Sequence, residues 1–380
     1  MIRYVSRVRN FLRRRRANKM LAASRRTRKH ATLLLKLDKV GDYILFRNFI
    51  EETRKHIHPL GRLVICGNIA WKELAEKLDQ EFVDEFIWVD PIILENEKNR
   101  IKLYRRLRKA RCSRIIYCSY SRTNDIDYIV LRSGAKEKVA FYGDETNILP
   151  IHKKENDAKY TMLIPSPAEC MFEFNRNKLF FEYIFNTKIE IDKPYINAKP
   201  ETENKNNPYI LIFPGAGHEI RRWAASNFAA LCVSLFQSYK LPIHVCGSKN
   251  EFHYAEEIIA RNGSFVINDA GKYSLYETIG IIKNAALVIT NDSGPLHISL
   301  AVNAPVLCIS NGNHFERFCP YPASMNMPLV TVFPDDFEVK LNDPVLKKSL
   351  RCKGSDIDIN GISPIKVFHT LENSNLLNHA

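Results

Sequence analysis

The sequence predicts an α/β protein with two doubly wound, parallel-sheet domains. Short apolar runs alternate with amphipathic segments from residue 31, stop at a polar, Asn- and Lys-rich stretch at 188–208, and resume at 209. The runs are apolar on both faces, which is typical of parallel strands covered by helices. A chain of 380 residues also has the length expected of two domains.

The first domain is expected at 31–187. Its predicted strands are 31–37, 62–67, 86–90, 114–119 and 138–143. Helix-like segments lie near 42–57, 69–80, 97–111 and 124–133, with another around 171–186. Strands that alternate with helices of this length form parallel βαβ units.

The second domain is expected at 209–380, after a linker at 188–208, and ends in a C-terminal extension. Its predicted strands are 209–214, 242–247, 264–268, 287–291 and 305–310, with helices at 226–238, 251–261, 274–284 and about 295–302. Ligands of such sheets bind outside the carboxyl ends of the strands. We therefore expect the two domains to face each other across a cleft that holds the site.

The positive charge is concentrated at the N-terminus. Of the net charge of +14, residues 1–30 supply twelve Lys or Arg and no Asp or Glu, which leaves +2 for 31–380. Apolar residues recur among the basic ones at helical spacing, so residues 1–29 are predicted to lie on an anionic membrane surface. A disordered solubilising extension, a nucleic-acid tail and an organellar presequence are the alternatives. Because no RNA-binding module follows the tail, no nucleic-acid partner is expected.

Several classes of protein are excluded by composition and spacing. No apolar run reaches the roughly 18 residues of a membrane span. The nine cysteines are scattered, odd in number and without a Cys-x-x-Cys pair, which indicates reduced thiols in a cytoplasmic protein. Neither the spacing of metal ligands nor a Gly-x-Ser-x-Gly nucleophile motif is present, so neither a metal site nor a cofactor is expected.

A first motif follows strand 31–37. Lys36, Asp38, Gly41 and Asp42 lie in the run LKLDKVGD, which is neither a dinucleotide fingerprint nor a phosphate-binding P-loop. Asp42 is placed at the mouth of the strand, on a helix N-terminus. A carboxylate there can serve the site or simply stabilise the helix end, and the same alternative applies to Asp38.

A second motif follows strand 209–214. Gly215 and Gly217 in the run PGAG allow backbone N–H groups to approach a ligand closely. Arg221, at the start of Arg-Arg-Trp, adds a positive charge suited to phosphate.

A third motif, NDSGPLH, follows strand 287–291. Asp292, Ser293 and Gly294 form a polar turn into a helix, and His297 lies in its first turn. A helix N-terminus at the mouth of a strand is suited to bind an anion. Plain helix capping by Asp292 or Ser293, with His297 in the core, is the structural alternative.

The three motifs, in this order, resemble glycosyltransferase family 9, the ADP-heptose:lipopolysaccharide heptosyltransferase family. The segment DIDYIVLRSGAKEKVAFY at 125–142 also fits, and the similarity covers roughly 31–310. The resemblance implies a GT-B fold of two Rossmann-like domains, with the acceptor held mainly by the first and the nucleotide sugar by the second. It also implies an inverting transfer that needs no metal.

The resemblance assigns roles to individual residues. Asp42 corresponds to the proposed general base, Arg221 faces the diphosphate where the family usually has Lys, and Glu251 matches an acid that contacts the nucleoside. The donor-binding residues are Gly215, Gly217, Asp292, Ser293, Gly294 and His297, and those on the acceptor side are Lys36, Asp38 and Gly41. Ala224 replaces a usual Pro, and the turn after strand 305–310 departs from the family pattern.

The expected function is transfer of a sugar, heptose from ADP-heptose, onto a lipopolysaccharide core or another lipid-linked glycan. The expected location is cytoplasmic, peripherally associated with the inner membrane. One alternative is a transferase of another nucleotide sugar in O-antigen or capsule assembly. The other is a non-catalytic nucleotide- or sugar-binding protein whose basic tail contacts membrane or nucleic acid.

Overall fold

The computed structural model describes residues 28–167, 169–198 and 207–377. Contacts divide the described chain into two compact units. The first unit contains the described residues within 1–39, 49–166 and 179–189, and the second those within 40–48, 167–178 and 190–380. Residues 1–27, which make up most of the tail predicted to lie on a membrane, fall outside the described residues. No helix among the described residues is long and apolar enough to cross a membrane.

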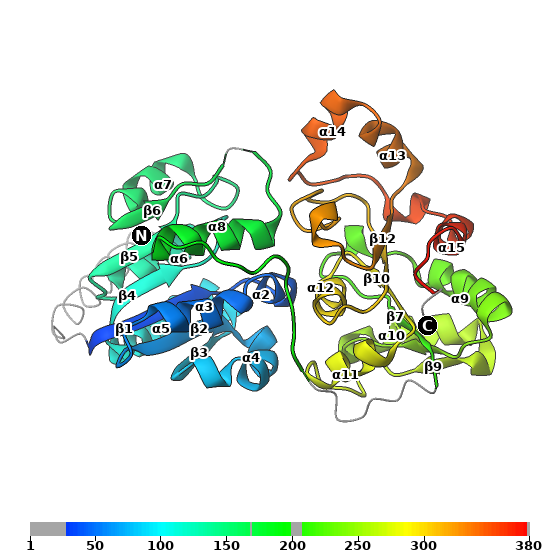
Figure 1. The fold of residues 1–380 in the computed structure, drawn as a ribbon, viewed down its shortest axis with the longest axis horizontal. Coiled ribbons are helices and arrows are strands. Elements are labelled where there is room, and N and C mark those ends of the chain that lie inside the picture. Colours follow the sequence, from blue (N-terminus) through cyan, green and yellow to red (C-terminus); the bar gives the residue numbers. More distant parts are fainter. Residues whose placement is uncertain (1–27, 168, 199–206, 378–380) are drawn as a thin grey trace, which may run out of the picture. The chain divides into compact units, whose positions relative to one another are not determined.

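The first unit is built on a six-stranded parallel sheet in the order β3-β2-β1-β4-β5-β6 (Figure 1). Its strands are β1 (Arg28–Lys36), β2 (Arg62–Asn68), β3 (Glu85–Val89), β4 (Cys112–Tyr117), β5 (Glu137–Phe141) and β6 (Met162–Ile164). This is the strand order of a dinucleotide-binding, doubly wound fold.

Helices cover both faces of the first sheet. Leu33 and Leu35 of β1 pack with α5 (Glu97–Ala110) and α6 (Asn124–Arg132) in one hydrophobic cluster. On the opposite face, α3 (Asn48–His56) and α8 (Glu173–Phe185) bring Phe49 and Phe181 together, with ring centroids 5.4 Å apart. Among the described residues, this unit also contains the α-helices α4 (Lys72–Leu78) and α7 (Pro150–Asp157).

The second unit repeats the same architecture. Its parallel sheet has the order β12-β11-β10-β7-β8-β9, which is the same doubly wound order counted from β7. The strands are β7 (Ile210–Phe213), β8 (Ile243–Val245), β9 (Val266–Asn268), β10 (Leu287–Asn291), β11 (Val306–Ile309) and β12 (Leu329–Val332). Two such sheets confirm the predicted α/β, doubly wound fold class.

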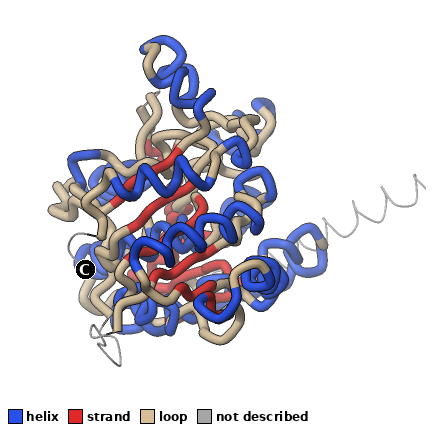
Figure 2. The backbone as a smooth tube through the Cα atoms, turned by 90° about the vertical axis from the view of Figure 1, so that its right-hand side faces the viewer, coloured by secondary structure: helices blue, strands red, loops and turns tan. Residues whose placement is uncertain are grey.

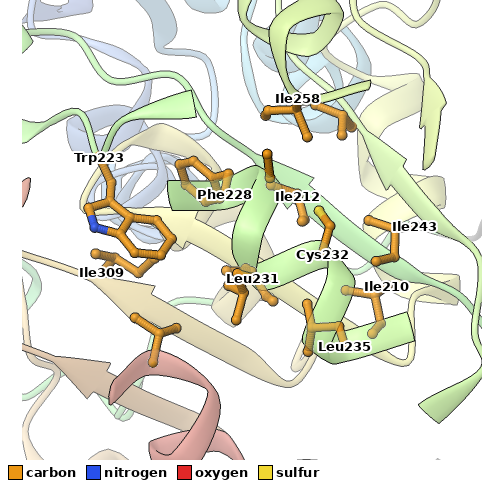
Figure 3. Packing of buried hydrophobic residues seen from close by; sticks show 14 of the residues in the cluster. Ile210, Ile212, Trp223, Phe228, Leu231, Cys232, Leu235, Ile243, Ile258 and Ile309 are labelled. Carbon is orange, nitrogen blue, oxygen red and sulfur yellow. The ribbon is translucent and has the colours of Figure 1, made fainter. Parts of the chain in front are cut away.

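One face of the second sheet carries the core drawn in Figure 3. Trp223 and Phe228 pack beside Ile309, Ile212 and other strand residues under α9 (Ala225–Tyr239), α10 (Phe252–Ala260) and α15 (Pro364–Glu372). The buried residues of α12 (Gly294–Ala301) lie outside this cluster and cover the opposite face, next to α11 (Glu277–Asn284). Helices therefore cover both faces of each sheet; Figure 2 draws the helices and strands in separate colours.

The helix predicted at 42–57 is two helices, α2 (Val40–Ile44) and α3. At the break, two polar side chains bind the backbone of one distant residue, Tyr195. Arg47 donates from Nη1 to the carbonyl oxygen of Tyr195 at 2.7 Å, and Asn48 bonds both the N–H and the C=O of Tyr195 at 3.1 Å. Contacts place α2 in the second unit, whereas the sequence prediction included it in the first domain.

The prediction that all nine cysteines are reduced was wrong. Cys170 and Cys352 form a disulfide with a Cα–Cα distance of 5.6 Å, and the other seven are free and buried. The two residues are 182 positions apart, so no local spacing could reveal the pair. Cys352 follows the hairpin of α13 (Asp335–Leu341) and α14 (Pro344–Leu350), which the sequence did not predict.

Candidate active site

The second sheet places β7 and β10 side by side at its centre, where the strand order reverses. Crevices outside the carboxyl ends of such strands are the usual ligand sites of this fold. β7 ends at Phe213 and β10 at Asn291, so the second and third sequence motifs both begin at this point. The fold thus brings together two motifs whose starts, Pro214 and Asn291, are 77 positions apart in the chain.

Asn291 ties the two motifs to each other. Its Nδ2 donates to the carbonyl oxygens of Pro214 and Gly215 at 2.7 and 3.3 Å, and its Oδ1 accepts from the backbone N–H of Trp223 at 3.2 Å. Asn291 is fully buried, as is Trp223, whose Nε1 donates to the carbonyl oxygen of Ile362. The turn after β7 therefore has a fixed position relative to the end of β10.

Glu251 lies against Gly215. A Cβ atom at Gly215 would lie 1.5 Å from Glu251 Oε1, so a larger residue there would displace this carboxylate. The other oxygen, Oε2, accepts from the backbone N–H and Oγ of Ser248 at 2.7 and 2.8 Å. Gly247 also borders the carboxylate, with a Cβ position 3.0 Å from Oε2. Glu251, which the family resemblance matches to an acid that contacts the nucleoside, thus lies beside the second motif.

Asp292 is a buried carboxyl group next to Arg221. Burial raises the pKa of Asp292 to about 6, while the positive charge of Arg221 and the hydroxyl of Ser310 oppose that rise. Ser310 Oγ lies 3.5 Å from Asp292 Oδ2. Arg221 Nη1 donates to the backbone oxygen of Asp292 at 3.4 Å. Arg221 is therefore held beside the turn that precedes α12.

Ser293 occupies the N-cap position of α12, but its side chain does not cap the helix. Its backbone is extended, with φ −153°, and its Oγ lies 3.5 Å from Thr290 Oγ1. Pro295 falls in the first turn of the helix, where its missing N–H costs nothing. The sequence allows plain helix capping by Ser293 as one alternative, and this alternative is therefore wrong. The positive end of α12 remains suited to an anion.

Helix α2 packs directly on the N-terminus of α12 within the second unit. A Cβ atom at Gly41 would lie 2.7 Å from His297 Cδ2, and one at Gly294 would lie 3.6 Å from Val40 Cβ. The first and third motifs thus meet at two glycines. Asp42, the next residue of α2, is half-buried in its first turn.

His297 is buried under this junction. Its Nδ1 is hydrogen-bonded to Tyr321 Oη at 2.9 Å, and only 4% of the residue is exposed. Burial, together with the smaller effect of the positive charge of Arg221, lowers the pKa of His297 to about 3. The imidazole is accordingly neutral at pH 7 and fills the space next to Gly41.

Lys36 and Asp38 lie in the first unit, at the switch point between β1 and β4. Lys36 Nζ is 2.9 Å from Asp38 Oδ2 and donates to the carbonyl oxygen of Cys118 at 3.2 Å. Ser119 Oγ donates to Asp38 Oδ2 at 2.5 Å, and Trp71 Nε1 donates to the Asp38 backbone oxygen. Lys36 is fully buried, whereas about a third of the Asp38 side chain is exposed.

The fold therefore gathers most of the predicted residues in the second unit. These are Gly41, Asp42, Gly215, Gly217, Arg221, Glu251, Asp292, Ser293, Gly294 and His297. Gly217 lies exposed in the loop after β7. The sequence reasoning did not single out Ser310 or Tyr321 as site residues. The polar end of strand 305–310 was a signal for the first, and nothing in the sequence marked the second.

Across the described parts of the chain, no three His, Cys, Asp or Glu side chains are grouped so that they could hold a metal ion. Metal independence of the transfer step stays a prediction.

Comparisons with known proteins agree with the motifs. Residues 131–339 match "Glycosyltransferase family 9 (heptosyltransferase)". The chain is 28% identical over 293 residues to lipopolysaccharide heptosyltransferase 1 of Campylobacter coli, covering 73% of this chain and 82% of that protein.

Solved structures show the same fold. The glycosyltransferase family 9 protein of Veillonella parvula superposes with a TM-score of 0.70 at 17% identity, covering 93% of this chain and 98% of that one. The ADP-heptose lipopolysaccharide heptosyltransferase II of E. coli superposes with a TM-score of 0.67 at 17% identity, covering 92% and 99%. The family match spans more than half of the sequence and includes the second and third motifs. The chain belongs to glycosyltransferase family 9, the heptosyltransferase family, and is a glycosyltransferase.

Proposed function

We propose that this enzyme transfers heptose from ADP-heptose to a lipopolysaccharide core or another lipid-linked acceptor, with inversion and without a metal or other cofactor. The observation that carries the proposal is the set of donor-motif residues at the β7/β10 switch point, where Asn291 joins the two motifs. The names of the similar proteins give ADP-heptose and lipopolysaccharide as their substrates.

In the proposed reaction, the acceptor hydroxyl attacks the anomeric carbon as the bond from that carbon to the diphosphate oxygen breaks. Negative charge builds up on the departing ADP. Arg221 and the N-terminus of α12 are the positive groups that this motif offers, and preorganised charge of this kind stabilises such a transition state. We assign the nucleoside to the side of Gly215 and Glu251.

Asp42 is proposed to take the proton of the acceptor hydroxyl as it attacks. Inversion needs one base on the face opposite the leaving group, and a positioned base contributes roughly 10²–10⁴-fold to the rate. Lys36 and Asp38 are proposed to lie on the acceptor side. The lipid-linked acceptor implies work at the cytoplasmic face of the inner membrane, where the basic tail would attach the enzyme.

A panel of nucleotide sugars tests the donor. A ligand at about 100-fold its Kd should stabilise the folded enzyme by roughly 2.7 kcal/mol. We expect the melting temperature to rise with ADP and ADP-heptose and to stay unchanged with UDP-, GDP- and CMP-sugars. Mass spectrometry with a heptose-free lipopolysaccharide core should then detect the added heptose. If the melting temperature rises only with another nucleotide sugar, the donor is not ADP-heptose. The enzyme would then be a transferase of that sugar in O-antigen or capsule assembly.

A further inference from the structure

Helix α5 is strongly basic in an otherwise acidic body. Residues 97–111 hold eight Lys or Arg and a single acid, Glu97. Residues 31–380 as a whole carry only +2, so the rest of that span is net negative. The donor and acceptor roles proposed above use none of these cations.

Four of the cations form one stripe. The buried residues of α5 are Leu103, Tyr104, Leu107 and Ala110. Lys98, Lys102, Arg105 and Lys109 recur at steps of four, three and four, and all four are exposed. At 3.6 residues per turn, this spacing places them on the side of the helix opposite the buried face. The stripe is about 16 Å long at 1.5 Å per residue.

Two exposed isoleucines stand at the start of this stripe. The short helix η3 (Pro91–Glu95) precedes α5 and leaves Ile92 78% and Ile93 46% exposed, while Leu94 is buried. Arg100 of α5 donates from Nη1 to the carbonyl oxygen of Leu94 at 2.7 Å. The isoleucines therefore have a fixed position relative to α5.

We propose that η3 and α5 form a docking surface for an anionic lipid bilayer. This lipid-docking surface consists of Ile92, Ile93, Lys98, Lys102, Arg105 and Lys109. A helix that is buried on one side, basic on the other and flanked by exposed aliphatic residues is suited to lie on a membrane interface. Exposed aliphatic side chains distinguish this surface from a nucleic-acid site, which uses aromatic residues to stack on bases.

The place of the surface in the fold agrees with a lipid-linked acceptor. η3 follows the carboxyl end of β3, and carboxyl ends of parallel strands lie along one edge of a sheet. Asp38, at the end of β1, lies on that same edge. This inference rests on the proposed function in one respect, because the acceptor assigned there is lipid-linked.

Charge reversal tests the surface in the full-length chain. Binding to vesicles of phosphatidylglycerol mixed with phosphatidylcholine is compared for wild type, Lys98→Glu/Lys102→Glu/Lys109→Glu, and a control. The control, Lys136→Glu/Lys154→Glu/Lys159→Glu, makes the same charge change at exposed positions elsewhere in the first unit. We expect the stripe variant to bind about tenfold more weakly or worse, and the control to stay within about twofold of wild type. Melting temperatures establish that each variant is folded.

Replacement of the isoleucines tests insertion separately. At high salt, which screens the cations, Ile92→Ser/Ile93→Ser should bind the same vesicles about threefold more weakly than wild type. Equal vesicle binding by the stripe and control variants would overturn the proposal. A stripe variant that binds vesicles like wild type but loses binding to single-stranded RNA would also overturn it. Stripe-dependent vesicle binding in a protein that transfers no heptose would refute the proposed function and leave the docking surface standing.

Discussion

Two ionisable side chains of the donor motif are buried, and burial favours the neutral form of each. Asp292 has its pKa raised to about 6 and His297 has its pKa lowered to about 3. Arg221 acts on both, since its positive charge favours the ionised carboxylate and disfavours a protonated imidazole. At pH 7 Asp292 is therefore mostly ionised beside the Arg221 guanidinium, and the imidazole of His297 is neutral.

Stability should depend on pH through His297. Between pH 6.5 and about 3 the unfolded chain binds a proton at this residue and the folded chain does not, so lowering the pH destabilises the fold. At about 1.36 kcal/mol per pKa unit, the loss from pH 7 to pH 5 is on the order of 2 kcal/mol. His297→Gln lacks this titration. Asp292, whose pKa is raised, instead adds stability as the pH falls from 6 to 4. Its contribution is the same in wild type and in His297→Gln, so it does not affect the comparison.

Melting temperatures of wild type and His297→Gln at pH 7 and pH 5 measure the effect. Wild type should lose more stability than the variant on acidification. Parallel pH dependences in the two proteins would show that the imidazole is not buried in its neutral form.

At the scale of elements, the junction of α2 with α12 matters most, because it joins the proposed base to the donor motif. Gly41 and Gly294 let the two helix starts approach closely, and the ring of His297 occupies the space that a Cβ atom at Gly41 would need. Overpacking a tight contact of this kind costs about 1–3 kcal/mol. A small displacement of α2 also moves Asp42, so activity should respond more than donor binding.

Gly41→Ala should therefore lower kcat at least tenfold and change the affinity for ADP little. His297→Ala removes the ring that the new methyl group meets. The double variant should then lose less activity and stability than the sum of the losses in the two single variants. We expect a coupling free energy of about 0.5–3 kcal/mol. Strict additivity of the two substitutions, measured on kcat and on the melting temperature, would refute the contact.

The sequence predicted elements with strong local patterns and missed those set by distant partners. Every predicted strand from 31–37 to 305–310 has its counterpart, because each is a short apolar run between polar segments. The two missed strands, β6 and β12, are edge strands of three and four residues. The division of 42–57 into two helices depends on Tyr195, about 150 residues away.

In the candidate site too, features with a local sequence pattern could be predicted, and features that depend on distant contacts could not. Polar clusters at strand ends revealed the three motifs, because glycine, carboxylate and helix-start residues are visible in the chain. The roles of Gly41 and Gly294 as packing residues were not visible, since they depend on how two distant helix starts meet. Tyr321 lies in an irregular stretch, so its bond to His297 had no sequence signal.

At the scale of the whole molecule, the chain builds the same doubly wound sheet twice, each with a switch point at which polar residues gather. The second unit is also cross-linked. Cys170 and Cys352 join the segment before α8 to the end of the α13–α14 hairpin, across 182 positions. A cross-link between such distant positions restricts the unfolded chain strongly.

Cys170→Ser/Cys352→Ser should lower the stability of the oxidised protein by up to about 5 kcal/mol, on the chain-entropy account of disulfide stabilisation. Wild type in a thiol reductant serves as the matched control and should melt with the variant. The seven other cysteines are buried, so they should add little to the difference. Equal melting temperatures of oxidised wild type and the variant would contradict a stabilising cross-link.

The most direct test of the account is heptose transfer by Asp42→Asn, measured as ADP release from ADP-heptose in the presence of a lipopolysaccharide acceptor. The account predicts that turnover falls by about 10²–10⁴-fold, because the base is lost. The affinity for ADP should stay within about threefold of wild type, because the donor motif is intact. Turnover near the wild-type rate in this variant would contradict the role of Asp42 and with it the proposed reaction.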